Sequence, residues 1–199
     1  EVIRNALLTV TSEMKNVVVR TALSPLWKDA GDVSCAILTR NAELVAQGQG
    51  DIPVHLATMP FSLKGILDRM PLNTLDEGDV LIQNDPYSGG NTHLPDVLMA
   101  IPVFADGEVI GFSGIRGHWT DLYSATAREI FDEGLIIPPV KLMRRGQWND
   151  DLVTVILANS RKPEERMGDV RAQEAGCRIG AQRLQRIVEK YDAATVKAA

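Results

Sequence analysis

The stretch VLMAIPVFADGEVIGFSGI, residues 97–115, is typical of two apolar strands joined by a tight turn. Residues 97–104 and 108–115 supply the strands, and Asp106-Gly107 between them is the strongest hairpin signal that a short sequence offers. We therefore predict an antiparallel hairpin. Its open ends bring the residues just before position 97 and just after position 115 to the same edge of a sheet.

The elements around this hairpin follow from the spacing of apolar residues. Helical spacing predicts helices over residues 2–22, 55–70, 150–160 and 163–191. Short β-rich or Pro-containing runs predict strands or extended segments at residues 33–38, 44–46, 80–82 and 136–142. Asn149 is placed as an N-cap because its side chain can accept a hydrogen bond from the first turn of the helix that follows.

This order of elements predicts a mixed α+β domain. We expect a mixed or antiparallel sheet with flanking helices and a long C-terminal helix. Gly168, Gly176 and Gly180 lie inside that last helix, and glycine disfavours a helix interior by about 1 kcal/mol relative to alanine. They weaken the prediction of one unbroken helix.

Composition limits the possible functions. The chain has 199 residues, 45% of them hydrophobic, which is enough for a core that needs no metal or disulfide to fold. The net charge of −5 argues against nucleic acid as a partner, because neutralising phosphates requires a basic face. No apolar run reaches the length of a membrane span. Cys35 and Cys177 are far apart in sequence and suit a reducing compartment, so we expect a cytoplasmic protein.

Two of the three histidines stand in the same short pattern at the open ends of the hairpin. His93-Leu94-Pro95-Asp96 precedes the first strand, and His118-Trp119-Thr120-Asp121 follows the second. Imidazoles and carboxylates that converge from rigid elements bind divalent ions, and this set without thiolate suits Mn²⁺, Fe²⁺ or Zn²⁺. The alternative is that the histidines are hydrogen-bonded packing residues and the aspartates form turns.

Three further residues are open to two interpretations. Asp32 opens an apolar strand and Asp85 ends another, so each is either a turn or cap residue or a further carboxylate beside the metal. His55 starts a helix after Pro53, so it either packs there or serves as an acid-base group near the metal. The Gly-rich run at residues 88–90 could cradle a phosphate, but no Walker lysine follows it.

Several stretches together resemble one family. They are EVIRN (1–5), DVSCA (32–36), IPVHL (52–56), NDPY (84–87), THLPDV (92–97), RGHWTD (116–121), EGLIIPPVKL (133–142) and ANSRKPEER (158–166). In this order the chain resembles the hydantoinase B/oxoprolinase family, which includes N-methylhydantoinase and caprolactamase subunits and the large subunits of acetone and acetophenone carboxylases. Its members run to several hundred residues, so the resemblance implies an N-terminal portion of a larger subunit.

The resemblance implies a divalent metal held by His93, Asp96 and His118, with Asp32 as a further ligand as in amidase-type relatives. It also implies a hydantoinase A-like partner subunit that uses ATP to phosphorylate the substrate carbonyl or amide oxygen. On this basis we expect a metal-binding α+β domain over residues 1–160 and a C-terminal helical segment over residues 161–199. His55 is the expected catalytic acid-base residue.

The resemblance leaves the reaction open. The leading hypothesis is the metal-bearing subunit of an ATP-dependent hydrolase of cyclic amides such as hydantoins, lactams or oxoproline. One alternative is a subunit of an ATP-dependent ketone carboxylase, and another is a non-catalytic assembly subunit of a hetero-oligomer. The last gains support from the altered run after Asp121, where this chain has Leu-Tyr-Ser and relatives have Gly-Gly after an Asp-Val. The loop before Arg128 is also shortened.

Overall fold

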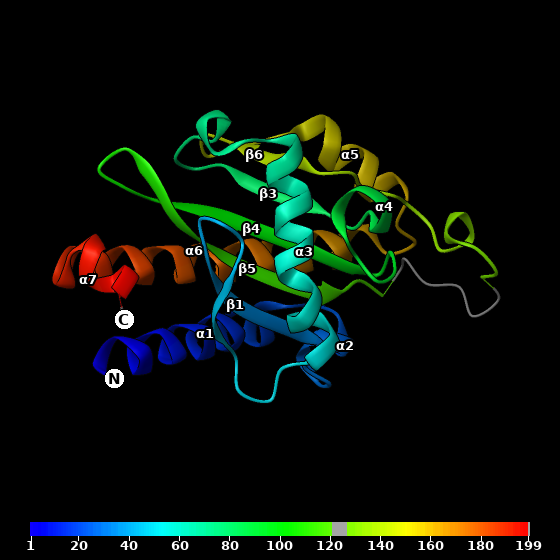
Figure 1. The fold of residues 1–199 in the computed structure, drawn as a ribbon. Coiled ribbons are helices and arrows are strands. Elements are labelled where there is room, and N and C mark those ends of the chain that lie inside the picture. The colour runs from blue at the N-terminus through cyan, green and yellow to red at the C-terminus, as the bar shows by residue number, and fades with distance from the viewer. Residues whose placement is uncertain (121–126, 199) are drawn as a thin grey trace.

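A seven-stranded sheet forms the centre of the molecule in a computed structural model that describes residues 1–120 and 127–198 (Figure 1). The strands are β1 (Val33–Thr39), β2 (Leu44–Gln47), β3 (Val80–Gln83), β4 (Asp96–Ala105), β5 (Glu108–His118), β6 (Val140–Arg144) and β7 (Gln147–Trp148). Their order is β2-β1-β5-β4-β3-β6-β7, and each neighbouring pair is antiparallel. The predicted α+β fold is therefore confirmed.

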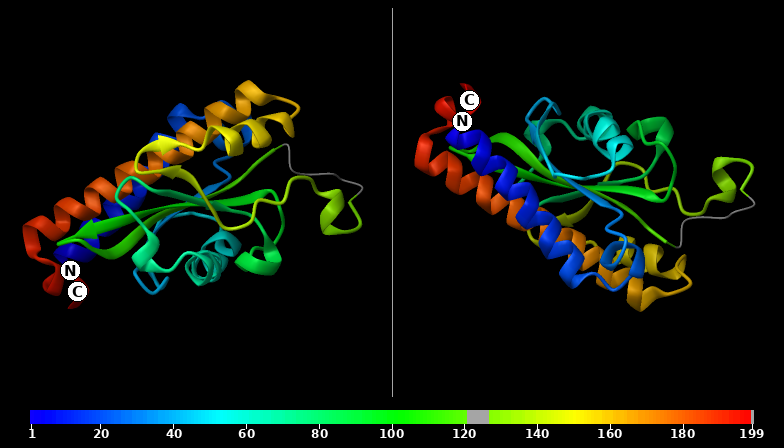
Figure 2. Two further views of the ribbon diagram at one scale, coloured as in Figure 1. Left: turned by 90° about the horizontal axis from the view of Figure 1, so that it is seen from above. Right: turned by 90° about the horizontal axis from the view of Figure 1, so that it is seen from below.

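Helices cover the two faces of this sheet. They are α1 (Val2–Thr21), α2 (Pro25–Lys28), α3 (Pro53–Arg69), α4 (Pro86–Gly89), α5 (Asp150–Ala158), α6 (Pro163–Tyr191) and α7 (Ala193–Ala198), with 3-10 turns at Leu72–Thr74 and Ile130–Asp132. Two views from opposite directions, from above and from below, show α1 and α6 packed along one face and α3 with α4 on the other (Figure 2). None of these helices, within the part of the chain that is described, is long and apolar enough to cross a membrane.

The predicted hairpin is confirmed and is longer than expected. Strand β4 begins at Asp96 and β5 ends at His118, and these two residues lie directly opposite each other in the register. Because β1 pairs with β5 in turn, Val33 lies beside Gly117, next to the same edge. The hairpin thus places one residue of each His-x-x-Asp pattern in neighbouring strands.

The long C-terminal helix is confirmed despite its glycines. A side chain at Gly176 would collide with Ile115 and Val18, and one at Gly180 would collide with Ser113 and Met14. The missing side chains let α6 approach both α1 and the sheet, so packing offsets the low helix propensity of glycine. Tertiary contact therefore overrides the local signal that weakened the prediction.

The remaining differences from the sequence predictions are local. The extended segment expected at 136–142 enters the sheet only at Val140, and β7 and the short helices α2, α4 and α7 were not predicted. Helix α3 begins at Pro53 rather than at residue 55, as suits proline in the first turn of a helix. The division of the chain at residue 160 stays a prediction.

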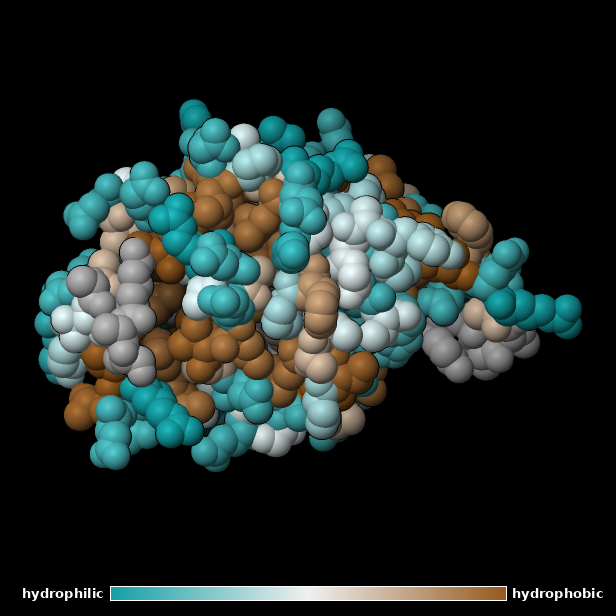
Figure 3. Space-filling view, in the orientation of Figure 1, coloured by the Kyte–Doolittle hydropathy of each residue, from teal (hydrophilic) through white to brown (hydrophobic). Residues whose placement is uncertain are grey.

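Apolar side chains of α3 and α4 remain exposed. Phe61 is 66% exposed and Val54 is 48% exposed on this helix, and Tyr87 of α4 is 80% exposed. The space-filling view shows apolar patches beside polar ones (Figure 3).

Candidate metal centre

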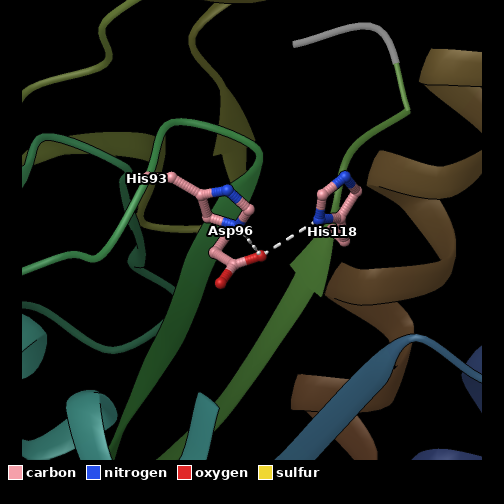
Figure 4. A group of neighbouring side chains, drawn as sticks. All are labelled: His93, Asp96 and His118. Atoms are coloured by element: carbon pink, nitrogen blue, oxygen red, sulfur yellow. Dashed lines mark ion pairs between the residues drawn. The ribbon is translucent and has the colours of Figure 1, made fainter. Parts of the chain in front are cut away.

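The two adjacent strand ends bring three side chains together. His118 is the last residue of β5, Asp96 is the first residue of β4, and His93 lies in the loop that leads into β4. Their side chains point toward one another at the edge of the sheet (Figure 4). One ligand atom from each residue lies within 4.8 Å of those of the other two, and the two imidazole rings are 5.1 Å apart between centroids.

The Asp96 carboxylate is the centre of this cluster. Its Oδ1 atom lies 2.7 Å from His93 Nε2, 3.3 Å from His118 Nδ1 and 3.3 Å from His55 Nε2. These separations match those between ligand atoms that share one ion with bonds of about 2.0–2.2 Å. Asp96 Oδ2 accepts a hydrogen bond of 3.2 Å from Thr92 Oγ1.

The buried Oδ1 atom of Asp96 forms no well-aligned hydrogen bond to the described residues, although three imidazole nitrogens lie within 3.3 Å of it. A buried polar atom without a partner is costly, so its place among three nitrogens needs an explanation. Burial is the largest influence on this carboxyl and acts to raise its pKa. The three imidazoles together outweigh burial and hold the pKa well below its usual range.

His55 reaches the same carboxylate from the opposite layer. It lies in the first turn of α3 and is 3% exposed. Its Nδ1 atom is 3.1 Å from Ser34 Oγ, which also accepts a hydrogen bond from the Ile52 amide. This contact sets the orientation of the ring and directs Nε2 toward Asp96. The structure thus places His55 beside the cluster, and its acid-base role stays a prediction.

Asp32 stands at the margin of the cluster. Its Oδ1 atom is 3.8 Å from His55 Nε2, and its backbone carbonyl accepts a hydrogen bond of 3.2 Å from the His118 amide. Asp32 does not belong to the tight group of His93, Asp96 and His118. Its side chain is partly exposed, at 24%, so it faces the open side of the site.

Two buried asparagines that we did not single out hold the loop that carries His93 and Asp96. Asn91 donates from its side-chain amide to the carbonyls of Asn84, His93 and Asp96, at 2.7 to 2.8 Å. Asn84 donates to the Leu94 and Leu135 carbonyls. Such outer contacts orient ligands before a metal binds. The only signal in the sequence was their place in the stretches NDPY and NTHLPD.

A polar cavity opens next to His93. It measures about 360 Å³ and is lined by Pro86, Tyr87, Thr92, His93, Ala127, Arg128, Glu129, Ile130 and Glu133. Its size falls within the usual range for small-molecule sites, about 300–1,000 Å³. Glu133 accepts a hydrogen bond of 2.9 Å from the Leu94 amide, so it also supports the loop. The Asp96 contact is the main cause of a raised pKa at His93, and Glu133 adds to it.

The other candidate residues have structural roles. Asp85 is the N-cap of α4 and accepts hydrogen bonds from the Tyr87 amide and Ser88 Oγ, which confirms the cap interpretation. Cys35 and Cys177 are both fully buried and free. Asp121 and the altered run after it lie outside the described residues.

Comparison with known proteins covers the whole chain. The family model for hydantoinase B/oxoprolinase matches residues 1–199. The chain is 35% identical to caprolactamase subunit beta of Pseudomonas jessenii over 204 residues, which is 99% of this chain and 35% of that protein. Against the crystal structure of ATP-dependent caprolactamase from P. jessenii the TM-score is 0.90 at 34% identity, over 99% of this chain and 35% of the other.

A second solved structure shares the fold. The nucleotide-free structure of acetone carboxylase matches with a TM-score of 0.84 at 19% identity, over 98% of this chain and 28% of the other. At this identity the likeness concerns the fold alone. The chain spans about a third of the length of the curated relative it matches, 35% for caprolactamase subunit beta.

Proposed function

Because this chain belongs to the hydantoinase B/oxoprolinase family, we propose that it is the metal-bearing part of a subunit of an ATP-dependent cyclic-amide hydrolase. The observation that carries the proposal is the buried Oδ1 atom of Asp96, which has three imidazole nitrogens within 3.3 Å and forms no well-aligned hydrogen bond to the described residues. A divalent cation is the partner that this arrangement of donors suits, since neutral imidazole and carboxylate are its ordinary ligands.

The residues that would hold the metal are His93, Asp96 and His118, with Asp32 as a further ligand from the open side. The donor set contains nitrogen and oxygen only, because both cysteines are buried elsewhere, and this suits Mn²⁺, Zn²⁺ or Fe²⁺. The bound ion would supply Lewis-acid polarisation of a substrate carbonyl or phosphoryl oxygen. Asn84 and Asn91 keep the loop in place so that these ligands need little rearrangement.

We assign the proton-transfer role to His55. Its Nδ1 atom has Ser34 as a partner, and its Nε2 atom points toward the carboxylates of Asp96 and Asp32. An imidazole that is held at one nitrogen and faces the site with the other can take or give a proton there. Its burial excludes bulk water from this side of the cluster.

The substrate we assign to the site is a small cyclic amide whose oxygen has been activated with ATP by a hydantoinase A-like partner subunit. The cavity beside His93 has the volume of a small-molecule site, and Arg128 and Thr92 on its wall can bind anionic or polar substituents. The P. jessenii relative is named a subunit and its structure is of an ATP-dependent enzyme, which supports an assembly with an ATP-using partner.

The test uses the full-length protein purified together with its partner subunit. Metal content is measured first, and then ATP-dependent turnover of a panel of lactams, hydantoins and ketones is followed with labelled bicarbonate. We expect about one divalent ion at this site per chain and ATP-dependent ring opening without incorporation of label.

Two other outcomes would replace this proposal. Incorporation of label into the product of a ketone would identify a carboxylase. The likeness to acetone carboxylase concerns the fold alone and does not favour this reaction. Absence of bound metal, together with unchanged turnover after His118→Ala, would identify a non-catalytic role for this domain. Lys141→Met is a control variant, because Lys141 is a partly buried residue of the same sheet that pairs with Asp79 and does not contact the cluster.

A further inference from the structure

Arg116 is a fully buried cation that the proposed chemistry does not use. It lies two residues before His118 in β5, on the same face of the sheet, and it is 0% exposed. Within residues 1–120 and 127–198, no carboxylate forms an ion pair with its guanidinium, and its Nε atom has no hydrogen-bond partner. A guanidinium stays charged at neutral pH. A charge buried without an ion-pair partner is costly and calls for a specific role.

The partners of this guanidinium are two hydroxyls on α3. One terminal nitrogen donates to Thr58 Oγ1 and the other donates to Ser62 Oγ. Thr58 and Ser62 are one helical turn apart, so both face the strand that carries Arg116. The contact therefore joins the helix of His55 to the strand of His118.

Each hydroxyl also contacts a backbone carbonyl in a segment of the site. Thr58 Oγ1 donates to the Val54 carbonyl at 2.7 Å and lies 3.4 Å from the His55 carbonyl, in the turn that holds His55. Ser62 Oγ lies 3.5 Å from the Gly90 carbonyl, in the loop that leads to His93. Arg116 is thus hydrogen-bonded to the first turns of α3, next to the segment that carries His55.

We propose that Arg116 is a positioning residue that holds the first turns of α3 so that His55 Nε2 points at Asp96. This inference rests on the proposed function, because it concerns how His55 serves the same site. The metal ligands on β4, β5 and the loop are held separately by the sheet register and by Asn84 and Asn91. Loss of Arg116 should therefore impair the action of His55 and leave metal occupancy intact.

The test is a double-mutant cycle between Arg116→Met and His55→Gln in the full-length protein with its partner subunit. Residues that act through one another give non-additive effects, whereas independent structural damage adds. We expect Arg116→Met to lower kcat about 10–100-fold, the usual effect of removing an outer partner of a metal site, with KM nearly unchanged. In the His55→Gln background the same change should lower kcat no further.

A second readout needs no turnover. The visible absorption spectrum of Co²⁺-loaded protein reports the surroundings of the ligands. Because His55 lies 3.3 Å from Asp96 Oδ1, His55→Gln and Arg116→Met should shift this spectrum alike, with full Co²⁺ stoichiometry in both. Arg116→Lys, which keeps the charge and can still donate to a hydroxyl, should restore part of the activity. Lys141→Met serves as the control and should change neither kcat nor the spectrum.

The outcomes separate this inference from the proposed function. If the wild-type protein binds no Co²⁺, both fall. If wild type and His55→Gln behave as proposed, two results would overturn only the role of Arg116. One is a normal kcat of Arg116→Met, and the other is a loss of kcat in Arg116→Met that adds fully to the loss in His55→Gln. Should Arg116→Met fail to fold, Thr58→Val removes one of the two anchors with little change in volume and is tested in the same cycle, with the same expected and contrary results.

Discussion

The two faces of the sheet differ in what they bury. On the face under α1 and α6, β1 and β5 present apolar side chains such as Cys35 and Ile115, packed against Met14. On the face under α3 the adjacent residues in the same two strands are Ser34 and Arg116, both fully buried and polar. Because side chains alternate along a strand, one pair of strands supplies both surfaces.

This difference suggests that one face of the sheet stabilises the fold and the other carries the candidate site. The α1 and α6 face is closely packed, since glycines in α6 allow direct contact with the strands. The α3 face also has an apolar cluster, which includes Phe112 and Leu63, but next to it the sheet and α3 bury the side chains of His55, Asp96 and Arg116. We infer that the first face holds the fold and that the second bears the site.

The sharpest test of this contrast is His118→Ala on the α3 face. It removes one imidazole from the cluster and leaves the apolar alternation of β5 intact. We expect turnover to fall more than about 100-fold with loss of bound metal, because even outer partners of metal sites cost 10–100-fold. The melting temperature should change little, since a domain of this size holds its core without a metal. A large loss of melting temperature would point instead to a structural metal.

The converse test is Ile115→Ala, three residues away in the same strand but on the other face. Ile115 is fully buried against α6, so the free energy of unfolding should fall by about 2–5 kcal/mol. Metal affinity of the folded protein should stay within about twofold. Denaturant unfolding and metal titration of the same preparation measure both quantities, and a matched drop in metal affinity would break the contrast between the faces.

A smaller effect is expected at Asn91, which holds the loop without touching the proposed metal. Asn91→Ala removes hydrogen bonds to three backbone carbonyls and should weaken metal binding about 10–100-fold. Asn41→Ala in the exposed turn between β1 and β2 is the control and should leave binding unchanged. Equal affinities for the two variants, by calorimetric titration, would show that the loop needs no such support.

The smallest effect concerns the thiols of the α1 and α6 face. Burial is the main cause of a raised pKa at Cys35 and Cys177, so little thiolate forms in the native protein at neutral pH. We expect both thiols to react with Ellman's reagent only after unfolding. Rapid modification of either thiol without denaturant would show that this face opens readily.

Much of this arrangement could be predicted from local sequence. The Asp106-Gly107 turn predicted the hairpin, and its strand pairing, which shifts by one residue between Val103 and Phe104, brings Asp96 opposite His118. His93 reaches them from the loop before β4. The strands and helices could also be predicted from the spacing of apolar residues, because this spacing depends only on residues close in sequence.

Long-range features could not be predicted in the same way. Nothing near residue 33 indicates that β1 pairs with β5, and this pairing brings Asp32 and Ser34 beside the cluster. The glycines of α6 looked unfavourable until their partners in α1 and the sheet were known. Asn84 and Asn91 looked like ordinary loop residues, since their role depends on carbonyls that fold around them.

The most direct test of the metal centre is X-ray diffraction near the absorption edge of the metal found in the active full-length protein. We expect one anomalous peak within about 2–2.5 Å of ligand atoms from His93, Asp96 and His118. Metal-replete, active crystals whose anomalous peak lies elsewhere, with Asp96 Oδ1 bonded only to imidazole N–H groups, would contradict the account.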